Sequence, residues 1–199
     1  MKLGILFSGG KDSSMALWWA QQKHEASCLI TMDSKNKESY MFHTDKVKEI
    51  PKLAKKLKIS LIFNQTKGVK EEELEDLKAA IQQAKRDYNI TGIVSGALAS
   101  NYQKTRVDKI CKELGLKSFA PFWHKDDKEY LKQIIDLGFK IKIVHVAAEG
   151  LSEQWVGKTI DKKFFDKILE LNKKYGVHIA GEGGEYETFV VNGPIFSKQ

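Results

Sequence analysis

The 199-residue sequence has little cysteine and no long apolar run. Its two cysteines, Cys28 and Cys111, lie far apart and outside any CxxC spacing, which argues against a disulfide framework or a structural zinc site and favours a reducing cytoplasm. No stretch approaches the roughly 20 apolar residues of a transmembrane helix, and the apolar run at 1–7 is too short for a signal peptide. We therefore expect a soluble, cytoplasmic protein that does not enter a membrane.

Arginine is also scarce, although the net charge is +7. Arg86 and Arg106 are the only arginines, so the positive charge comes almost wholly from lysine. Scattered lysine is typical of a solvated surface, and it also suits an anionic partner such as ATP or an acidic protein face. Because there is no dense arginine patch and no RNA-binding motif, we do not predict a nucleic-acid partner.

The sequence has enough apolar residues, 42%, to bury a core. Up to residue 120, short apolar runs alternate with longer amphipathic ones. The predicted strands are 2–7, 27–32, 60–64 and 92–95, and the predicted helices are 12–23, 43–57 with a break at Pro51, 71–88 and 100–114. This alternation predicts an α/β fold with a doubly wound parallel sheet, whose ligand lies at the carboxyl ends of the strands.

The rhythm of the sequence loosens beyond Pro121. We expect a helix at 126–137, a strand at 140–146, a loop at 150–158, a helix at 161–175 and a last strand at 188–191. There are no internal repeats and no low-complexity linker. The sequence thus predicts an α/β domain at 1–120 and a smaller C-terminal α+β lobe at 121–199 that packs closely against it.

Residues 8–13, Ser-Gly-Gly-Lys-Asp-Ser, follow the first predicted strand directly and open the first helix. Glycines let backbone N–H groups approach an anion, and a helix N-terminus suits pyrophosphate. Lys11 adds a positive charge, while Asp12 either caps the helix or holds a magnesium ion. The pattern is neither GxxxxGK[ST] nor GxGxxG, and the alternative interpretation is a tight strand-to-helix turn without a ligand.

This loop resembles the SGGxDS loop of the PP-loop ATP pyrophosphatases. The resemblance implies their adenine-nucleotide hydrolase-like (HUP) fold, ATP and magnesium as cofactors, and adenylation of a substrate oxygen with release of pyrophosphate. It also implies which residues contact the nucleotide: Ser8, Gly9, Gly10, Lys11, Asp12 and Ser13 in the loop, Thr31 and Met32 near the end of the second strand, and Gly96 after the fourth. Lys11 and Asp12 are the expected catalytic residues of the loop, and Asp12 is the expected metal ligand.

Further segments narrow the resemblance. Residues 39–44 precede the second helix, 95–97 and 100–107 (Ser-Asn-Tyr-Gln-Lys-Thr-Arg-Val) follow the fourth strand, and 181–189 (Gly-Glu-Gly-Gly-Glu-Tyr-Glu-Thr-Phe) lie near the end. With Leu151, Trp155, Gly157 and residues 175–178, they resemble the diphthine–ammonia ligase family from end to end. Lys104 stands where arginine is more familiar in that family, which keeps the charge but loses bidentate geometry.

The resemblance implies a reaction and its partners. ATP adenylates the carboxylate of diphthine on translation elongation factor 2, and ammonia then displaces AMP to leave the amide. Free ammonium is the expected nitrogen donor, because the sequence has no N-terminal cysteine or glutaminase domain. The sequence also lacks the extra C-terminal domains of eukaryotic members, which favours an archaeal-type enzyme. The oligomeric state is not predicted, and a homodimer remains open.

The resemblance also suggests residues for the substrate end of the site. Arg106, or Lys104, is a candidate catalytic cation, with a surface ion pair to Asp108 or another acid as the alternative. The candidate substrate-binding residues are Tyr102, Gln103, Lys104, Trp155, Glu182, Gly183, Gly184, Glu185, Tyr186 and Glu187. We hypothesise that carboxylates and aromatic rings among them form a cage for the trimethylammonium group of diphthine. Alternatively one glutamate orients or deprotonates ammonium, and Glu185 is our candidate for this catalytic role. A third interpretation of the segment is a solvent-exposed acidic turn.

Two other functions stay open. One is a different PP-loop ligase, such as a tRNA-modifying adenylating enzyme, for which Cys28 and Cys111 are poorly placed as a thiolation pair. The other is a non-catalytic adenine-nucleotide-binding module, which has no need of a loop for leaving pyrophosphate. His43 and His178 fall in family-like segments, and we interpret both as structural hydrogen-bonding residues in preference to bases.

Overall fold

The computed structural model describes residues 1–36 and 46–196. Residues 37–45 and 197–199 lie outside the described chain, and with them the segment 39–44, His43 and the start of the predicted second helix. In the described part of the chain, no helix has the length and apolar character of a membrane span.

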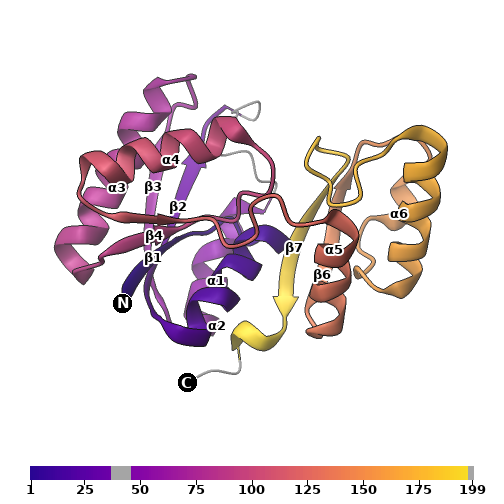
Figure 1. The fold of residues 1–199 in the computed structure, drawn as a ribbon, viewed down its shortest axis with the longest axis horizontal. Coiled ribbons are helices and arrows are strands. Elements are labelled where there is room, and N and C mark those ends of the chain that lie inside the picture. The colour runs from indigo at the N-terminus through magenta and orange to yellow at the C-terminus, as the bar shows by residue number, and fades with distance from the viewer. Residues whose placement is uncertain (37–45, 197–199) are drawn as a thin grey trace.

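The N-terminal part is built on a five-stranded parallel sheet with the order β3-β2-β1-β4-β5 (Figure 1). Its strands are β1 (Lys2–Leu6), β2 (Glu25–Ser34), β3 (Ser60–Thr66), β4 (Gly92–Val94) and β5 (Lys117–Phe119). The connecting helices are α1 (Lys11–Lys23), α2 (Ile50–Leu57) after a 3-10 turn at Val47–Glu49, α3 (Glu72–Tyr88) and α4 (Asn101–Glu113). The sheet order reverses beside β1, so the loops after β1 and β4 flank the switch point where such sheets bind ligands.

Alternation of apolar side chains along the strands produces two packed faces. Leu3 and Ile5 of β1 belong to one buried cluster with helices α1 and α2. Cys28 and Ile30 of β2 belong to a second cluster with helices α3 and α4. The sheet is therefore covered on both sides, which confirms the predicted doubly wound α/β architecture.

The C-terminal lobe contains a two-stranded antiparallel sheet and two helices. Its elements are α5 (Asp127–Asp136), β6 (Lys140–Val146), a 3-10 turn at Glu153–Trp155, α6 (Lys162–Tyr175), β7 (Tyr186–Asn192) and a 3-10 turn at Pro194–Phe196. Tyr130 of α5 and Phe164 of α6 are fully buried in the same cluster as Met15 and Leu17 of α1. Figure 1 shows β7 running between α1 and the rest of the lobe. The C-terminal lobe and helix α1 thus share one core.

Most predicted elements are found within a few residues of their predicted bounds. Pro51 restarts the helix as predicted, since it occupies the first turn of α2. Two differences concern strands: β5, at the sheet edge, was not predicted, and β7 begins at Tyr186 and not at residue 188. A strand of three residues, such as β5, is too short to show the alternation typical of strands. At the start of β7, the preceding glycines indicate a loop, so the sequence pattern places the start of the strand after Tyr186.

Candidate active site

The loop between β1 and α1 has a conformation that only glycine accommodates at position 9. Gly9 has φ +77°, and a Cβ there would lie 2.7 Å from the ring of Phe189 on β7. Gly10, the N-cap residue of α1, has no side chain to cap the helix. Its carbonyl accepts hydrogen bonds from the hydroxyls of Ser13 (3.1 Å) and Ser14 (2.8 Å). Local sequence therefore shapes the loop but leaves helix N–H groups to be satisfied from elsewhere.

Strand β7 supplies that missing partner. The backbone N–H of Lys11 donates to Thr188 Oγ1 at 3.0 Å, and the N–H of Val190 donates to the carbonyl of Gly9 at 2.8 Å. Thr188 thus acts as a helix cap from the C-terminal lobe. The loop at residues 8–13, which we call the phosphate loop, is completed by a segment that lies far away in the sequence.

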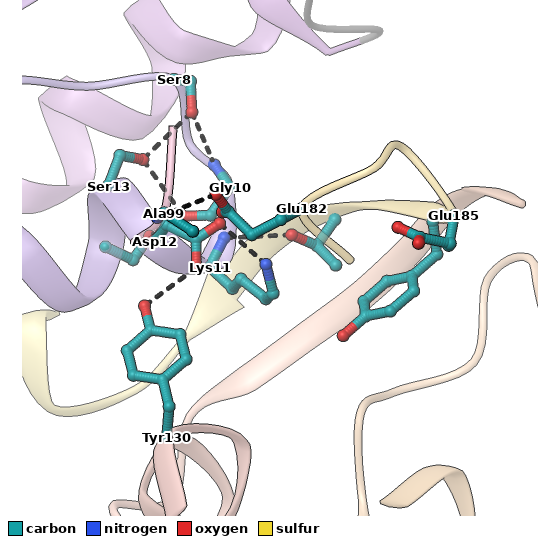
Figure 2. A network of polar contacts seen from close by, with 12 residues as sticks. Ser8, Gly10, Lys11, Asp12, Ser13, Ala99, Tyr130, Glu182 and Glu185 are labelled. Carbon is teal, nitrogen blue, oxygen red and sulfur yellow. Dashed lines mark hydrogen bonds and ion pairs between the residues drawn. The ribbon is translucent and has the colours of Figure 1, made fainter. Parts of the chain in front are cut away.

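The carboxylate of Asp12 has partners on both oxygens (Figure 2). Lys11 Nζ lies 2.7 Å from Oδ2, and the hydroxyl of Tyr130 donates to Oδ1 at 2.9 Å. Lys11 is only 4% exposed and Tyr130 is fully buried. Sequence reasoning missed Tyr130, because a tyrosine on an amphipathic helix is indistinguishable from an ordinary core residue.

The loop after β4 approaches the same helix terminus. A Cβ on Gly96 would lie 2.6 Å from the backbone carbonyl carbon of Asp12, so only glycine permits this approach. Three residues further on, the N–H of Ala99 donates to Glu182 Oε2 at 3.2 Å. Segments from both parts of the chain therefore converge on the start of α1.

A cavity of about 400 Å³ opens at this point. The predicted site residues that line it are Ser8, Gly10, Lys11, Asp12, Ser13, Thr31, Met32, Gly96, Gln103, Glu182, Gly184, Tyr186 and Glu187. Its apolar lining, which the sequence did not single out, includes Leu6, Ile30, Val47, Leu77 and Val107. A cavity with an apolar part and a helix N-terminus in its wall suits a nucleotide, with the base against the former and the phosphates against the latter.

Glu182 is the motif glutamate that faces the phosphate loop. Burial raises its pKa above the ordinary value, and the charge of Asp12 raises it further, while Lys11 and the N–H of Ala99 act in the opposite direction. Burial also raises the pKa of Tyr130 and of Tyr186 well above the usual range, so both phenols stay protonated at neutral pH. The site therefore combines two coupled carboxylates, one buried ammonium and neutral hydroxyl donors.

Glu185, three residues further along the same motif, has a different environment. Its Oε1 accepts the N–H of His178 at 3.1 Å, and its Oε2 accepts the N–H of Gly183 at 2.8 Å. Gly183, Glu185 and the loop residue Gly9 border the site without lining the cavity. The carboxylate of Glu185 therefore holds the 178–185 turn together. His178 itself contacts Asp127 at 3.3 Å through Nε2, which agrees with a structural role.

Arg106 lies outside the cavity lining, in an ion pair with Glu71. Its guanidinium stacks on the ring of Tyr102, 3.4 Å from the centroid, and the Tyr102 hydroxyl donates to Glu71 Oε1 at 3.1 Å. The hydrogen bond from Arg106 is the main cause that lowers the pKa of Glu71. This is the ion pair of the alternative interpretation, with Glu71 as its acid, while Asp108 pairs with Lys104 at 2.5 Å. A catalytic role for Arg106 stays a prediction.

Trp155 is likewise away from the cavity lining. Its ring packs edge-on against Phe164 with centroids 5.5 Å apart, and Lys158 Nζ lies 4.8 Å from its centroid. Trp155 therefore does not line this cavity, and its role in substrate binding stays a prediction.

The fit of a magnesium ion depends on Asp12 and Glu182. No cluster of three or more His, Cys, Asp or Glu suited to a metal exists among residues 1–36 and 46–196. Magnesium, however, usually needs only one or two carboxylates beside substrate phosphates and water. Asp12 and Glu182 line one cavity, and the charge of Asp12 raises the pKa of Glu182, so a divalent cation would relieve their repulsion. The donor set fits the ion.

A glycine-rich loop that joins the first strand to the first helix, at the switch point of a parallel sheet, defines a nucleotide-binding α/β protein. Comparison with protein families is more specific: residues 1–118 match the diphthamide synthase N-terminal domain and residues 126–199 the diphthamide synthase C-terminal domain. The chain belongs to the diphthamide synthase family.

Three similar relatives are each named diphthine–ammonia ligase. The mouse and human proteins are 33% and 32% identical over the whole chain, which covers 82% of each. The fission yeast protein is 34% identical, but the chain covers only 36% of it. The chain thus spans most of the length of the two mammalian relatives and about a third of the length of the yeast one. An archaeal-type origin stays a prediction.

Among solved structures, a predicted subunit of a tRNA methyltransferase from Methanocaldococcus jannaschii aligns over 98% of both chains. The TM-score is 0.53 and the identity is 16%. This likeness concerns the fold alone.

Proposed function

We propose that this chain is an ATP-dependent diphthine–ammonia ligase, which adenylates the carboxylate of diphthine on translation elongation factor 2 and amidates it with ammonia. Family membership over both domains supports the reaction. The observation that carries the proposal is the meeting of Lys11, Asp12 and Glu182 on one cavity at the N-terminus of α1. Residues 1–120 then bind ATP, and residues 121–199 bind the protein substrate in the cytoplasm, where translation takes place.

In the first step, a carboxylate oxygen of diphthine attacks the α-phosphorus of ATP. A bond forms between that oxygen and phosphorus, the bond to the β-phosphate oxygen breaks, and pyrophosphate leaves. This step needs charge neutralisation and alignment more than a strong base. The N–H groups of the phosphate loop bind the leaving group, and Lys11 turns from Asp12 toward it. A magnesium ion held by Asp12, with Glu182 beside it, would add positive charge at the phosphates.

In the second step, ammonia attacks the acyl carbon of the adenylate: the carbon–nitrogen bond forms, the bond from that carbon to the AMP oxygen breaks, AMP leaves, and the new amide nitrogen releases one proton to solvent. Ammonium must first lose a proton, because only the neutral amine has a free electron pair. We assign this proton to Glu182, because its carboxylate lines the cavity and lies at the N-terminus of α1, where Oε2 accepts the N–H of Ala99. For the trimethylammonium group, the candidates that line the cavity and have no other assigned role are Tyr186 and Glu187.

The reaction is tested by incubating the protein with ATP, magnesium, ¹⁵N-ammonium and diphthine-bearing elongation factor 2. We expect AMP, pyrophosphate and a ¹⁵N-labelled amide on the factor, each dependent on the factor. Lys11→Met serves as the inactive control. ATP binding without pyrophosphate release would indicate a nucleotide-binding module, and adenylation of tRNA in place of the factor would indicate a tRNA-modifying enzyme.

The role of Glu182 is tested separately with hydroxylamine, which is mostly unprotonated at pH 7.5 and therefore needs no base to free its electron pair before attack. Glu182→Gln should lose most of its activity with ammonium but keep much of it with hydroxylamine. Glu185→Gln, matched in chemistry and in the same motif, should affect the two nucleophiles equally, because that carboxylate serves the turn. Equal losses for Glu182→Gln would remove it as the proton acceptor.

A further inference from the structure

Tyr130 brings a buried hydroxyl group to the point where the apolar core of the lobe meets the carboxylate of Asp12. The residue lies on α5 of the C-terminal lobe, is 0% exposed, and packs against Phe122 with ring centroids 5.3 Å apart. Phenylalanine would fill this place without desolvating a polar atom, since a buried hydroxyl is unfavourable unless it is hydrogen-bonded. Among the described residues, its hydroxyl makes one hydrogen bond, to Asp12 Oδ1 at 2.9 Å.

The two partners of Asp12 differ in how firmly they are held. Lys11 reaches Oδ2 through a flexible four-carbon stem, and in the proposed reaction its ammonium turns toward the phosphates. Tyr130 is a rigid ring enclosed by the core of the lobe, so its hydroxyl cannot follow. Because the terminal torsion of an aspartate is broad, the plane of the Asp12 carboxylate is set by whichever partner stays in place.

The helix that carries Tyr130 also contacts the glutamate-rich turn. Asp127, one turn before Tyr130 on α5, pairs with His178 at 3.3 Å, and the N–H of His178 is held by Glu185. One helix thus connects the phosphate loop to the segment that faces substrate.

We infer that Tyr130 is a positioning residue: through its hydroxyl, the C-terminal lobe sets the orientation of Asp12 in the phosphate loop and so aligns the adenylation step. This inference rests on the proposed function. A merely structural Tyr130 would affect stability, whereas a positioning residue affects kcat through Asp12.

The test is a double-mutant cycle of Tyr130→Phe and Asp12→Asn, read as pyrophosphate release in the complete assay. We expect Tyr130→Phe to lower kcat about tenfold, the effect of one charge-assisted hydrogen bond, with less than a threefold change in KM for ATP. In the Asp12→Asn background the same substitution should change kcat by less than about twofold, since the partner charge is gone. Equal effects in both backgrounds, or no effect in the wild type, would overturn the inference.

Phe122→Leu is the matched control for packing. It disturbs the ring against which Tyr130 packs without removing the hydroxyl, so it should lower the melting temperature but leave kcat within about twofold. If Phe122→Leu lowers kcat as much as Tyr130→Phe does, packing and not the hydroxyl is responsible, and the inference is overturned. A wild-type protein that forms no amide would instead count against the proposed function itself.

Discussion

The hydroxyl of Thr188 accepts a hydrogen bond from the backbone N–H of Lys11, although the two residues are 177 positions apart. Thr188 lies on β7, and Lys11 is the first residue of α1. An N-cap contact is usually local, made by the side chain of the residue just before the helix. Here that residue is Gly10, so the cap comes from the other lobe and joins the phosphate loop to the substrate side of the site.

We expect Thr188→Val to weaken both stability and nucleotide binding. Loss of a capping hydroxyl typically reduces the free energy of unfolding by about 1 kcal/mol, and here it also loosens the loop that we propose to bind pyrophosphate. KM for ATP should rise several-fold. Urea unfolding and steady-state kinetics measure the two effects, and Thr188→Ser, which keeps the oxygen, should restore most of both. A Ser variant as impaired as the Val variant would contradict the cap.

Gly96→Ala should abolish productive ATP binding. The added methyl would lie 2.6 Å from backbone carbon of Asp12, where no flexible side chain can give way. The phosphate loop must therefore move, and we expect KM for ATP to rise more than about tenfold. Gly115→Ala is the control, because its φ of +64° gives strain of about 1 kcal/mol but its Cβ meets nothing within 4 Å. Unchanged KM values in both variants would argue against the close approach.

Glu182→Gln should stabilise the protein at neutral pH while it impairs amidation. The pKa of Glu182 is raised in the folded state, so the native protein holds this proton to higher pH than the unfolded chain does. The stability that the folded protein gains from the protonated form of Glu182 is fully present below the pKa of the unfolded chain, about 4.3. This contribution is lost as the pH rises through the pKa of Glu182 in the folded protein. The variant should therefore have the higher urea midpoint at pH 7.5, and the difference should vanish near pH 4. A constant difference at all pH values would show that charge burial is not the cause.

Substitutions at Arg106 and Glu71 distinguish a structural ion pair from a catalytic role of Arg106. If Arg106 only pairs with Glu71, then Arg106→Met and Glu71→Gln should change kcat by similar, small factors, because the pair lies outside the cavity lining. If Arg106 acts on the phosphates, Arg106→Met alone should lower kcat strongly. The pair itself is checked by NMR titration of Glu71, whose pKa is lowered chiefly by the hydrogen bond from Arg106 and should rise toward its ordinary value in Arg106→Met.

The pattern of the sequence was sufficient for four of the five strands of the parallel sheet and for the glycine-rich loop after the first. Apolar alternation and the glycines at 9 and 10 report on local backbone geometry, and local geometry is what a sequence encodes most directly. The partners across the site were not predictable in the same way. Nothing in the sequence distinguishes Tyr130 from a core tyrosine, or Glu182 from Glu185 in one motif, because the difference lies in which distant groups each side chain meets.

The sequence by itself therefore determined the class of fold, the family and the glycine-rich loop between β1 and α1, since each depends on spacing along the chain. Tertiary structure alone decided how that loop is completed. Thr188 caps α1 and Tyr130 holds Asp12. Glu182 of the C-terminal lobe interacts electrostatically with Lys11 and Asp12. Each contact joins positions more than 100 residues apart, and only the packing of β7 and α5 against α1 brings them together.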